Sequence, residues 1–283
     1  MILYKAPVTL KEEIKTIRQS GKTIGFVPTM GALHKGHISL INISKTKCDI
    51  TVCSIFVNPT QFNDPIDFEK YPSTIANDIL LLETNGCDIL FLPSVAEIYP
   101  SGTKPAIHYD LGDIEYILEG KYRPGHFQGV CQVVHQLLDM VNPDYLFLGQ
   151  KDYQQTIVIK RLVQLINYAT KVITVSTFRE DTGLAMSSRN LRLTAEQKEN
   201  AVSISKMLHY IAAHYADTPV RQLEKHATNY LLDNGFHKVD YVSIAEAETL
   251  QPVNDITKPG RLIALIAAFI SEIRLIDNMI LKG

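Results

Sequence analysis

The hydrophobic positions follow two different periods along the first two thirds of the chain. Short continuous apolar runs are typical of strands buried on both faces, and apolar residues that recur every three or four positions are typical of helices. The continuous runs predict strands at residues 23–28, 50–57, 88–92, 145–148 and 172–178. The helical period predicts helices at residues 10–20, 36–47, 73–85, 128–141 and 153–166. Because strands and helices alternate, we expect βαβ units and a mostly parallel sheet with helices on both faces.

The pattern changes after residue 190. A capping-box sequence and a proline at a first helical turn predict two helices, and two apolar runs predict two strands, at residues 194–215, 218–235, 239–244 and 262–270. Two helices followed by two strands indicate a small α+β domain. We therefore expect a larger α/β domain at residues 1–178 and a smaller α+β domain at residues 179–283.

The composition is that of a folded protein, and its net charge is not the positive charge expected of a protein that binds nucleic acid. The chain has 283 residues, of which 46% are hydrophobic and 20% charged, with a net charge of −2. Its longest apolar run near the C-terminus is too short for a membrane span, which needs roughly 20 residues, and we see no signal peptide. The cysteines form no C-x-x-C pair, so we expect core residues of a cytoplasmic protein rather than disulfides or zinc ligands: Cys48, Cys53, Cys87 and Cys131.

The first predicted strand runs through a glycine-punctuated turn into a helix. Such a junction directs free backbone N–H groups at an anion. His34 and His37 lie three residues apart across it, and Gly36 between them leaves room for close approach of a ligand. A lone His-x-x-His is more often a satisfied loop pair or half a metal site. Its spacing is poor for a helical zinc pair, and no cysteine or acidic residue adjoins it. Phosphate binding is therefore the favoured interpretation.

Polar residues also follow two other predicted strands. Asn58 and Gln61 follow the second strand, and residues 149–155 follow the fourth. Ligands bind at the carboxyl ends of parallel strands, so we expect these segments to share a site. Lys151 could reach phosphate and Asp152 could hold a ribose, a water or Mg²⁺, although both could equally be surface charges.

For two glutamines, Gln61 and Gln155, we expect a more specific role in binding a carboxylate substrate. A neutral amide can bind the hydroxyls and the carboxylate of a substrate without pairing that carboxylate to a fixed cation. A carboxylate that must attack phosphorus then keeps more of its nucleophilicity. The alternative is that Gln155 belongs to a solvated helix face.

The segment at residues 179–190 is polar, carries a glycine and is long enough to be mobile. Taken alone, its Ser-Ser-Arg sequence is most often a solvated loop. Opposite a phosphate site, Ser187, Ser188 and Arg189 could close over a triphosphate, because the planar guanidinium binds phosphate bidentately and stays charged.

Several of these motifs resemble one known family. The string Pro-Thr-Met-Gly-Ala-Leu-His-x-Gly-His at residues 28–37 resembles the H-x-G-H signature of the nucleotidyltransferase and class I aminoacyl-tRNA synthetase superfamily, and residues 186–189 resemble its K-M-S-K-S loop. Together with residues 56–62, 123–130 and 274–278, they resemble the pantothenate synthetase family over nearly the whole chain. The departures are small: Ser73 where arginine is usual, Gln136 where lysine is common, and Leu148 where phenylalanine is frequent.

The resemblance implies a Rossmann-like sheet and a homodimeric, AMP-forming carbon–nitrogen ligase. Such an enzyme joins (R)-pantoate to β-alanine through a pantoyl adenylate, with ATP and Mg²⁺. It implies pantoate binding at Gln61 and Gln155, β-alanine binding at Asn58 and Gln61, and proton donation by His37. It also implies ATP binding by Met30, Gly31, Ala32, Leu33, His34, Lys35, Gly36, His37, Gly149, Gln150, Lys151, Asp152, Phe178, Met186, Ser187, Ser188 and Arg189. Arg123 and His126 are expected near the second substrate.

Two other functions stay open. A cytidylyl- or adenylyltransferase of the same superfamily would leave the nucleotide on its product, and it would need neither the glutamine pair nor an amine site. An ATP-binding regulatory module would not turn over its ligand. The complete set of phosphate-facing cations, together with both glutamines, argues against that module.

Overall fold

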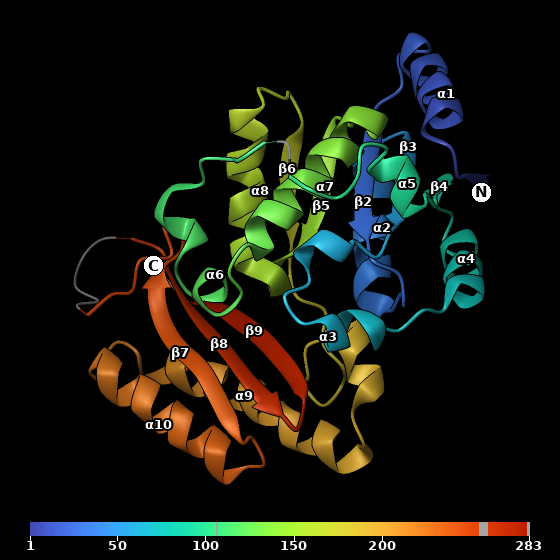
Figure 1. Cartoon of the computed structure of the whole chain (residues 1–283). Coiled ribbons are helices and arrows are strands. Elements are labelled where there is room, and N and C mark those ends of the chain that lie inside the picture. Colours follow the sequence, from blue (N-terminus) through green and yellow to red (C-terminus); the bar gives the residue numbers. More distant parts are fainter. Residues whose placement is uncertain (106, 255–259, 282–283) are drawn as a thin grey trace.

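The computed structural model describes residues 1–105, 107–254 and 260–281 and divides them between two sheets (Figure 1). The larger sheet has six strands, all parallel to their neighbours. In spatial order they are β1 (Ile2–Tyr4), β4 (Ile89–Phe91), β3 (Ile50–Ile55), β2 (Ile24–Thr29), β5 (Tyr145–Gly149) and β6 (Lys171–Val175). The predicted parallel sheet is confirmed.

The strand order creates a switch point between β2 and β5. From β2 the chain continues to β3 and β4 on one side, and from β5 it continues to β6 on the other side. Segments that follow β2 and β5 therefore diverge, and the crevice between them is where open α/β sheets bind ligands.

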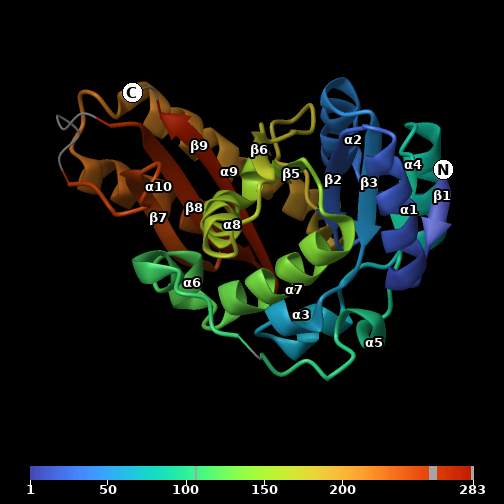
Figure 2. The same cartoon turned by 90° about the horizontal axis from the view of Figure 1, so that it is seen from above.

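Helices cover both faces of this sheet, as the sequence predicts (Figure 2). In β2, Phe26 packs into the core under α1, α7 and α8, whereas Val27 packs into the core under α2 and α4. The opposite directions of successive strand residues explain this division. The helices are α1 (Pro7–Gln19), α2 (Lys35–Lys47), α4 (Ile75–Thr84), α7 (His126–Val141) and α8 (Tyr153–Leu165). Short helices complete the unit: α3 (Pro65–Glu69), α5 (Val95–Ile98) and α6 (Glu119–Tyr122).

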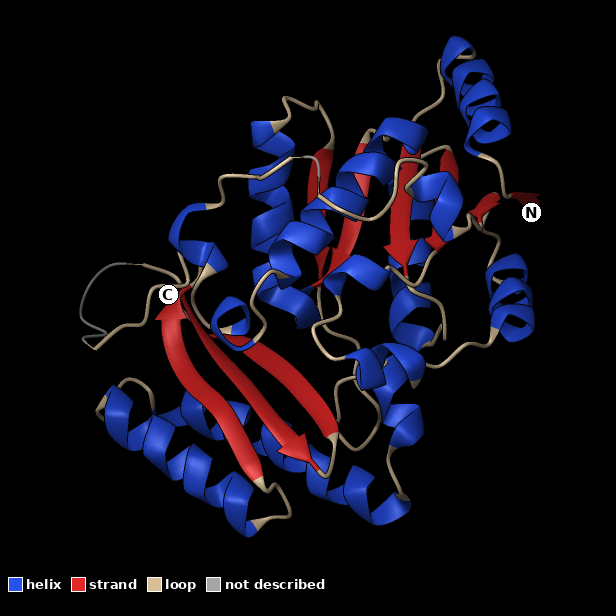
Figure 3. Cartoon of the chain, in the orientation of Figure 1, coloured by secondary structure: helices blue, strands red, loops and turns tan. Residues whose placement is uncertain are grey.

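The smaller sheet is antiparallel, in the order β7-β8-β9, and two helices pack on one of its faces (Figure 3). Its elements are α9 (Ala195–His214), α10 (Val220–Asp233), β7 (Lys238–Glu246), β8 (Leu262–Ile270) and β9 (Ile273–Leu281). Ile263 and Leu265 of β8 instead join the core that contains α7 and α8, so the two units share apolar packing. The predicted α+β unit is confirmed, and the boundary at residues 178/179 stays a prediction. No helix of the described residues is long and apolar enough to cross a membrane.

Some predicted boundaries are wrong, and two strands escape the hydrophobic pattern. The strand predicted at 172–178 ends at Val175, which leaves Phe178 in a loop, and the helix predicted from residue 73 begins at Ile75. The first helix begins at Pro7, since proline favours a first helical turn. The edge strand β1 is too short to show alternation. Strand β9 is hidden because polar residues interrupt its apolar pattern, and those residues have partners elsewhere in the fold.

A buried charge network joins α6 to the smaller sheet. The Arg274 guanidinium donates to both Glu119 carboxylate oxygens at 2.7 Å and to Asp240 at 2.8 Å. The Tyr241 hydroxyl donates to Glu119 at 2.7 Å. Burial opposes ionisation of Glu119, but the hydrogen bonds and charge of Arg274 outweigh it and lower the pKa of Glu119 to about 2.

This network predicts a pH-dependent contribution to stability. Glu119→Gln should lower the free energy of unfolding at pH 7 by about 3 kcal/mol, because it removes one carboxylate from a buried guanidinium. The folded-state pKa lies below the unfolded value of about 4.3, so the contribution is present above that pH and is lost as the pH falls towards 2. Urea unfolding at pH 7 and pH 3 should therefore show a smaller difference between variant and wild type at pH 3.

The exposed Lys70–Glu272 pair provides the control. Glu272→Gln should change the unfolding free energy much less, because solvent screens exposed pairs. Equal losses in the two variants, or a Glu119→Gln deficit that does not change with pH, would contradict this account.

Candidate active site

A cavity of about 210 Å³ lies at the carboxyl ends of β2 and β5, where the strand order places the crevice. It is lined by most of the residues that the sequence predicts for a site: Met30, His34, Gly36, His37, Asn58, Gln61, Gly149, Lys151, Asp152, Gln155, Phe178, Met186, Ser187, Ser188 and Arg189. The other predicted residues are near neighbours of these in the chain and do not line it: Gly31, Ala32, Leu33, Lys35 and Gln150.

The two histidines form the N-terminal cap of α2. The Gly36 N–H donates to Nδ1 of His34 at 3.1 Å, and the His34 N–H donates to Nδ1 of His37 at 3.3 Å. Both Nδ1 atoms are acceptors, so each neutral imidazole carries its hydrogen on Nε2. The helix start therefore offers two imidazole N–H donors beside its own positive end. A Cβ at Gly36 would lie 2.9 Å from the His34 ring, so packing against that ring also requires glycine.

The environment keeps both histidines neutral. Burial and the positive charge of Lys151 lower the pKa of His34 to about 4. Burial, together with His34 and Lys151, lowers the pKa of His37 well below its usual range. A neutral imidazole donates a hydrogen bond, whereas proton transfer from it requires an anion that raises its pKa. The role of His37 as a proton donor stays a prediction.

Both polar side-chain atoms of Asn58 form hydrogen bonds to other residues of the protein. Its Nδ2 donates to the Gly129 carbonyl at 3.1 Å and to Oε1 of Gln61 at 3.3 Å, and its Oδ1 accepts from the Tyr99 hydroxyl at 2.8 Å. A Cβ at Gly129 would lie 2.2 Å from the Thr60 carbonyl, so glycine is needed for this approach of α7. Asn58 therefore orients Gln61, and the residue has no polar atom left for a direct contact unless these bonds change.

The adjacent glutamines Gln154 and Gln155 have different environments. Gln154 is buried, donates to the carbonyls of Ile114 and Ile117 and accepts from the Glu119 N–H. Gln155 lines the cavity and has no side-chain hydrogen bond to the residues described. Gln155 therefore lies in the cavity, half-buried, and its role in binding pantoate stays a prediction.

The turn after β5 is fixed by β9. The Asn278 side chain donates to the carbonyls of Gln150 and Lys151, each at 2.9 Å. Nζ of Lys151 lies 3.6 Å from the Asp152 carboxylate. The contact with Asn278 was not expected from the sequence, because it depends on a strand more than a hundred residues away.

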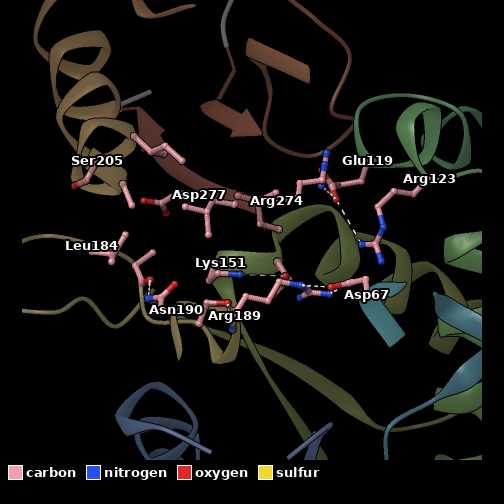
Figure 4. A pocket seen from close by; sticks show the side chains of 17 residues that line it. Asp67, Glu119, Arg123, Lys151, Leu184, Arg189, Asn190, Ser205, Arg274 and Asp277 are labelled. Carbon is pink, nitrogen blue, oxygen red and sulfur yellow. Dashed lines mark hydrogen bonds and ion pairs between the residues drawn. The ribbon is translucent and has the colours of Figure 1, made fainter. Parts of the chain in front are cut away.

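The segment that leads into the smaller unit packs against the larger one. Ser188 Oγ donates to the Ala32 carbonyl at 3.0 Å. Arg189 forms a two-pronged ion pair with Asp67 of α3, at 2.6 and 3.2 Å. A second hollow adjoins the cavity here and shares Lys151, Asp152, Ser187 and Arg189 with it (Figure 4). Asp67 was not expected from the sequence, since no local signal marks a partner 122 residues away.

The described residues contain no group of three or more histidine, cysteine, aspartate or glutamate side chains that could hold a metal ion. Asp152 lies at the cavity wall and already contacts Lys151. A Mg²⁺ ion at this site would therefore need most of its oxygen ligands from a substrate and from water, as Mg²⁺ commonly has.

Fold, strand order and site together define a nucleotide-binding α/β protein of the H-x-G-H type. A model of the family described as pantoate-beta-alanine ligase matches residues 3–280. The pantothenate synthetase of Cytophaga hutchinsonii is 44% identical over 283 residues, with 99% of each chain covered. The chain belongs to the pantoate-beta-alanine ligase family. It is a carbon–nitrogen ligase that joins pantoate to β-alanine with ATP.

Solved structures agree with this assignment. The pantothenate synthetase of Thermus thermophilus superposes with a TM-score of 0.91 at 34% identity, covering 99% of both chains. The pantoate-beta-alanine ligase of Francisella tularensis, complexed with beta-gamma ATP and beta-alanine, superposes with a TM-score of 0.84 at 40% identity and covers 99% of this chain and 97% of that one. These matches confirm the predicted fold and family.

The low histidine pKa values can be tested directly. In ¹⁵N-labelled protein without substrates, we expect the His34 imidazole to titrate near pH 4, because burial and Lys151 both disfavour its charged form. His37 should titrate well below the usual range of a histidine, because burial, His34 and Lys151 all disfavour its charged form. Lys151→Ala should raise the His34 pKa, since it removes a nearby positive charge. Titration of either imidazole near 6.5, or no response to Lys151→Ala, would contradict the account.

Proposed function

We propose that the cavity catalyses ligation in two steps through a pantoyl adenylate. The proposal rests on one observation: the histidine cap and Lys151 line the same cavity as Gln61 and Gln155. This arrangement places cationic and N–H donors for phosphate beside neutral amides for a carboxylate substrate. In the first step a pantoate carboxylate oxygen bonds to the α-phosphorus of ATP, and the bond to the bridging oxygen breaks as pyrophosphate leaves. In the second, the β-alanine amine attacks the acyl carbon, AMP leaves and the nitrogen loses a proton.

The phosphate groups would be held by His34, His37, Lys151 and the segment from Ser187 to Arg189. Two neutral Nε2–H donors can stabilise charge that develops on the α-phosphate, and they need no reorganisation during the reaction. Arg189 would exchange part of its contact with Asp67 for phosphate. The adenine would meet the backbone at Phe178. Asp152 would help to hold a Mg²⁺ ion that accompanies the phosphates, and the ion would supply charge neutralisation there.

The carboxylate of pantoate would be held by amides rather than by a cation. Gln61 is oriented by Asn58, and Gln155 has its amide available in the cavity. A carboxylate bound in this way is not stabilised by a permanent positive charge, so it remains a better nucleophile towards phosphorus. No protein nucleophile is required, and rate enhancement comes from positioning and electrostatic stabilisation.

β-Alanine would enter through the adjoining hollow that Gln61, Arg123 and His126 line. His126 and Arg123 contact the Gln61 carbonyl at 2.7 and 3.4 Å, so they hold the backbone of a proposed substrate residue. The Francisella tularensis enzyme, whose structure is complexed with beta-alanine, supports an amine site in this family. The role proposed for Asn58 is indirect, through Gln61.

We also propose that the enzyme is a cytoplasmic homodimer. The four cysteines are free, as is common in reducing compartments. Exposed apolar side chains gather near the N-terminus, where Ile2 and Leu3 belong to the edge strand β1 and Val8 to α1. An apolar edge strand of this kind is a surface that proteins usually cover.

The order of product release tests the two-step reaction. Enzyme mixed with ATP, Mg²⁺ and pantoate should release pyrophosphate in a burst of about one equivalent per active site, before any amine is present. Addition of β-alanine should then release AMP. A rapid-quench experiment with labelled ATP measures both products. A nucleotide that stays on a stable final product would instead favour a cytidylyl- or adenylyltransferase reaction.

Substitution of Gln155 tests the pantoate site. Gln155→Ala should weaken pantoate binding by roughly 1–3 kcal/mol, because it leaves substrate polar groups unpaired in a desolvated site. Gln155→Glu should lose more, because it sets a negative charge against a carboxylate. ATP affinity should change little in both variants. Calorimetric titration with each substrate measures these affinities.

Gln154→Ala is the matched control, since the neighbouring amide binds only backbone groups. It should lower thermal stability without a selective effect on pantoate. If the Gln155 variants keep normal pantoate affinity and lose ATP affinity, Gln155 belongs to the nucleotide site.

A further inference from the structure

Asp78 on α4 is a buried carboxylate that binds the turn before the histidines. Its side chain is almost fully buried, with 1% of its surface exposed. Oδ2 accepts the Ala32 N–H at 2.9 Å, and Oδ1 accepts the Leu33 N–H at 2.8 Å and the Thr74 hydroxyl at 2.9 Å. Asp78 forms no ion pair within the described part of the chain. Burial of a carboxylate is unfavourable unless hydrogen bonds replace those it made to water. Two of the three groups that donate to Asp78 are backbone N–H groups of the turn before the histidines.

That turn has an unfavourable backbone conformation. Gly31 has φ +82° and Ala32 has φ +47°. Glycine adopts the left-handed region freely, but in a residue with a Cβ this conformation is strained, because the Cβ approaches the following carbonyl oxygen. Such strain persists only where surrounding contacts determine the conformation. Asp78 holds the N–H side of this turn, and Ser188 donates to the Ala32 carbonyl from the other side.

The turn also sets the position of the histidine cap. Leu33, whose N–H binds Asp78, directly precedes His34, the residue that caps α2. A shift of the Ala32–Leu33 peptide would therefore move the backbone of His34, and His37 with it through the capping bonds. Displacement of a reacting group by about 1 Å can lower a rate by a factor on the order of 100.

We propose that Asp78 is a positioning residue for adenylate formation. It holds the strained Ala32–Leu33 peptide so that the imidazole donors of His34 and His37 face the cavity. Ser188 closes on the same peptide, so one turn connects α4, the histidine cap and the segment before the smaller unit. The proposal rests on the function proposed above, in which the histidine turn binds the phosphates of ATP.

Asp78→Asn provides the first test. The amide has nearly the same shape but only one acceptor oxygen, so it sets an N–H₂ group against one of the backbone donors. The rate of adenylate formation per active site, measured by rapid quench in a single turnover, should fall about 10- to 100-fold. Pantoate affinity should change less than about twofold. Active-site titration removes any contribution from unfolded protein.

Ala32→Gly provides a rescue that a purely structural role would not give. Glycine adopts the left-handed conformation without an anchor, so the double variant Asp78→Asn with Ala32→Gly should recover most of the lost rate. If Asp78 contributed only to folding, Asp78→Asn would lower the melting temperature and leave the rate per active site unchanged. That result, or a double variant no faster than Asp78→Asn, would overturn the proposal.

Two further variants keep the test decisive. Asp49→Asn is the matched control, because Asp49 accepts the Thr23 N–H and hydroxyl at the opposite end of β2, at 2.8 and 2.7 Å. It should leave the rate per active site unchanged. If Asp78→Asn does not fold, Thr74→Val, which removes one neutral donor to Asp78, should slow the reaction in the same direction by a smaller factor. A wild-type rate in Thr74→Val would then overturn the proposal.

His37→Ala separates this proposal from the function on which it rests. It should slow adenylate formation by a factor on the order of 10²–10³, the usual cost of removing one preorganised donor. If His37→Ala keeps the full rate, the proposed phosphate site fails. If His37→Ala is slow and Asp78→Asn is not, only the role of Asp78 fails.

Discussion

The position of the site depends on two neighbouring parallel strands, β2 and β5, from which the chain departs in opposite directions. Their following segments cannot pack against each other at the sheet edge, so a crevice remains between them. The histidine turn follows β2 and the Lys151 turn follows β5. A different strand order with the same local sequences would separate these groups, and the amide and phosphate-facing residues would no longer line one cavity.

Within this crevice, burial and charge act on different residue types. Desolvation keeps His34 and His37 neutral, and a neutral imidazole donates a hydrogen bond without holding a counterion. Lys151 and Arg189 contribute positive charge to the same cavity, and the hydrogen bonds and charge of Asp67 raise the pKa of Arg189 against the effect of burial. Arg189 lies against Asp67, so the cavity contains cations that are already balanced. Such a site can bind a polyanion by exchange of partners rather than by accumulation of unpaired charge.

The smaller unit contributes to the site through the polar residues of β9. Arg274 pairs with Glu119, Asp277 pairs with Arg179, and Asn278 holds the carbonyls at the turn after β5. Burial of charged groups is unfavourable unless their partners are correctly placed. These contacts therefore favour one relative placement of the two sheets, and the same placement brings the segment before α9 onto the histidine turn.

The sequence alone determined the parallel sheet, its helices and the convergence of three motifs, because apolar periodicity is local and the carboxyl ends of parallel strands share one edge. The sequence also indicated the family, because motifs that resemble those of the family occur over nearly the whole chain. It did not separate Gln154 from Gln155, since only packing decides which side of α8 is buried. Asp67 and Asp78 have no local signature, and their partners lie 122 and about 46 residues away. Strand β9 was hidden for the same reason: its polar residues are satisfied by distant groups. Tertiary structure decided these points because hydrogen bonds and ion pairs depend on distances in space, whereas burial leaves a periodic trace along the chain.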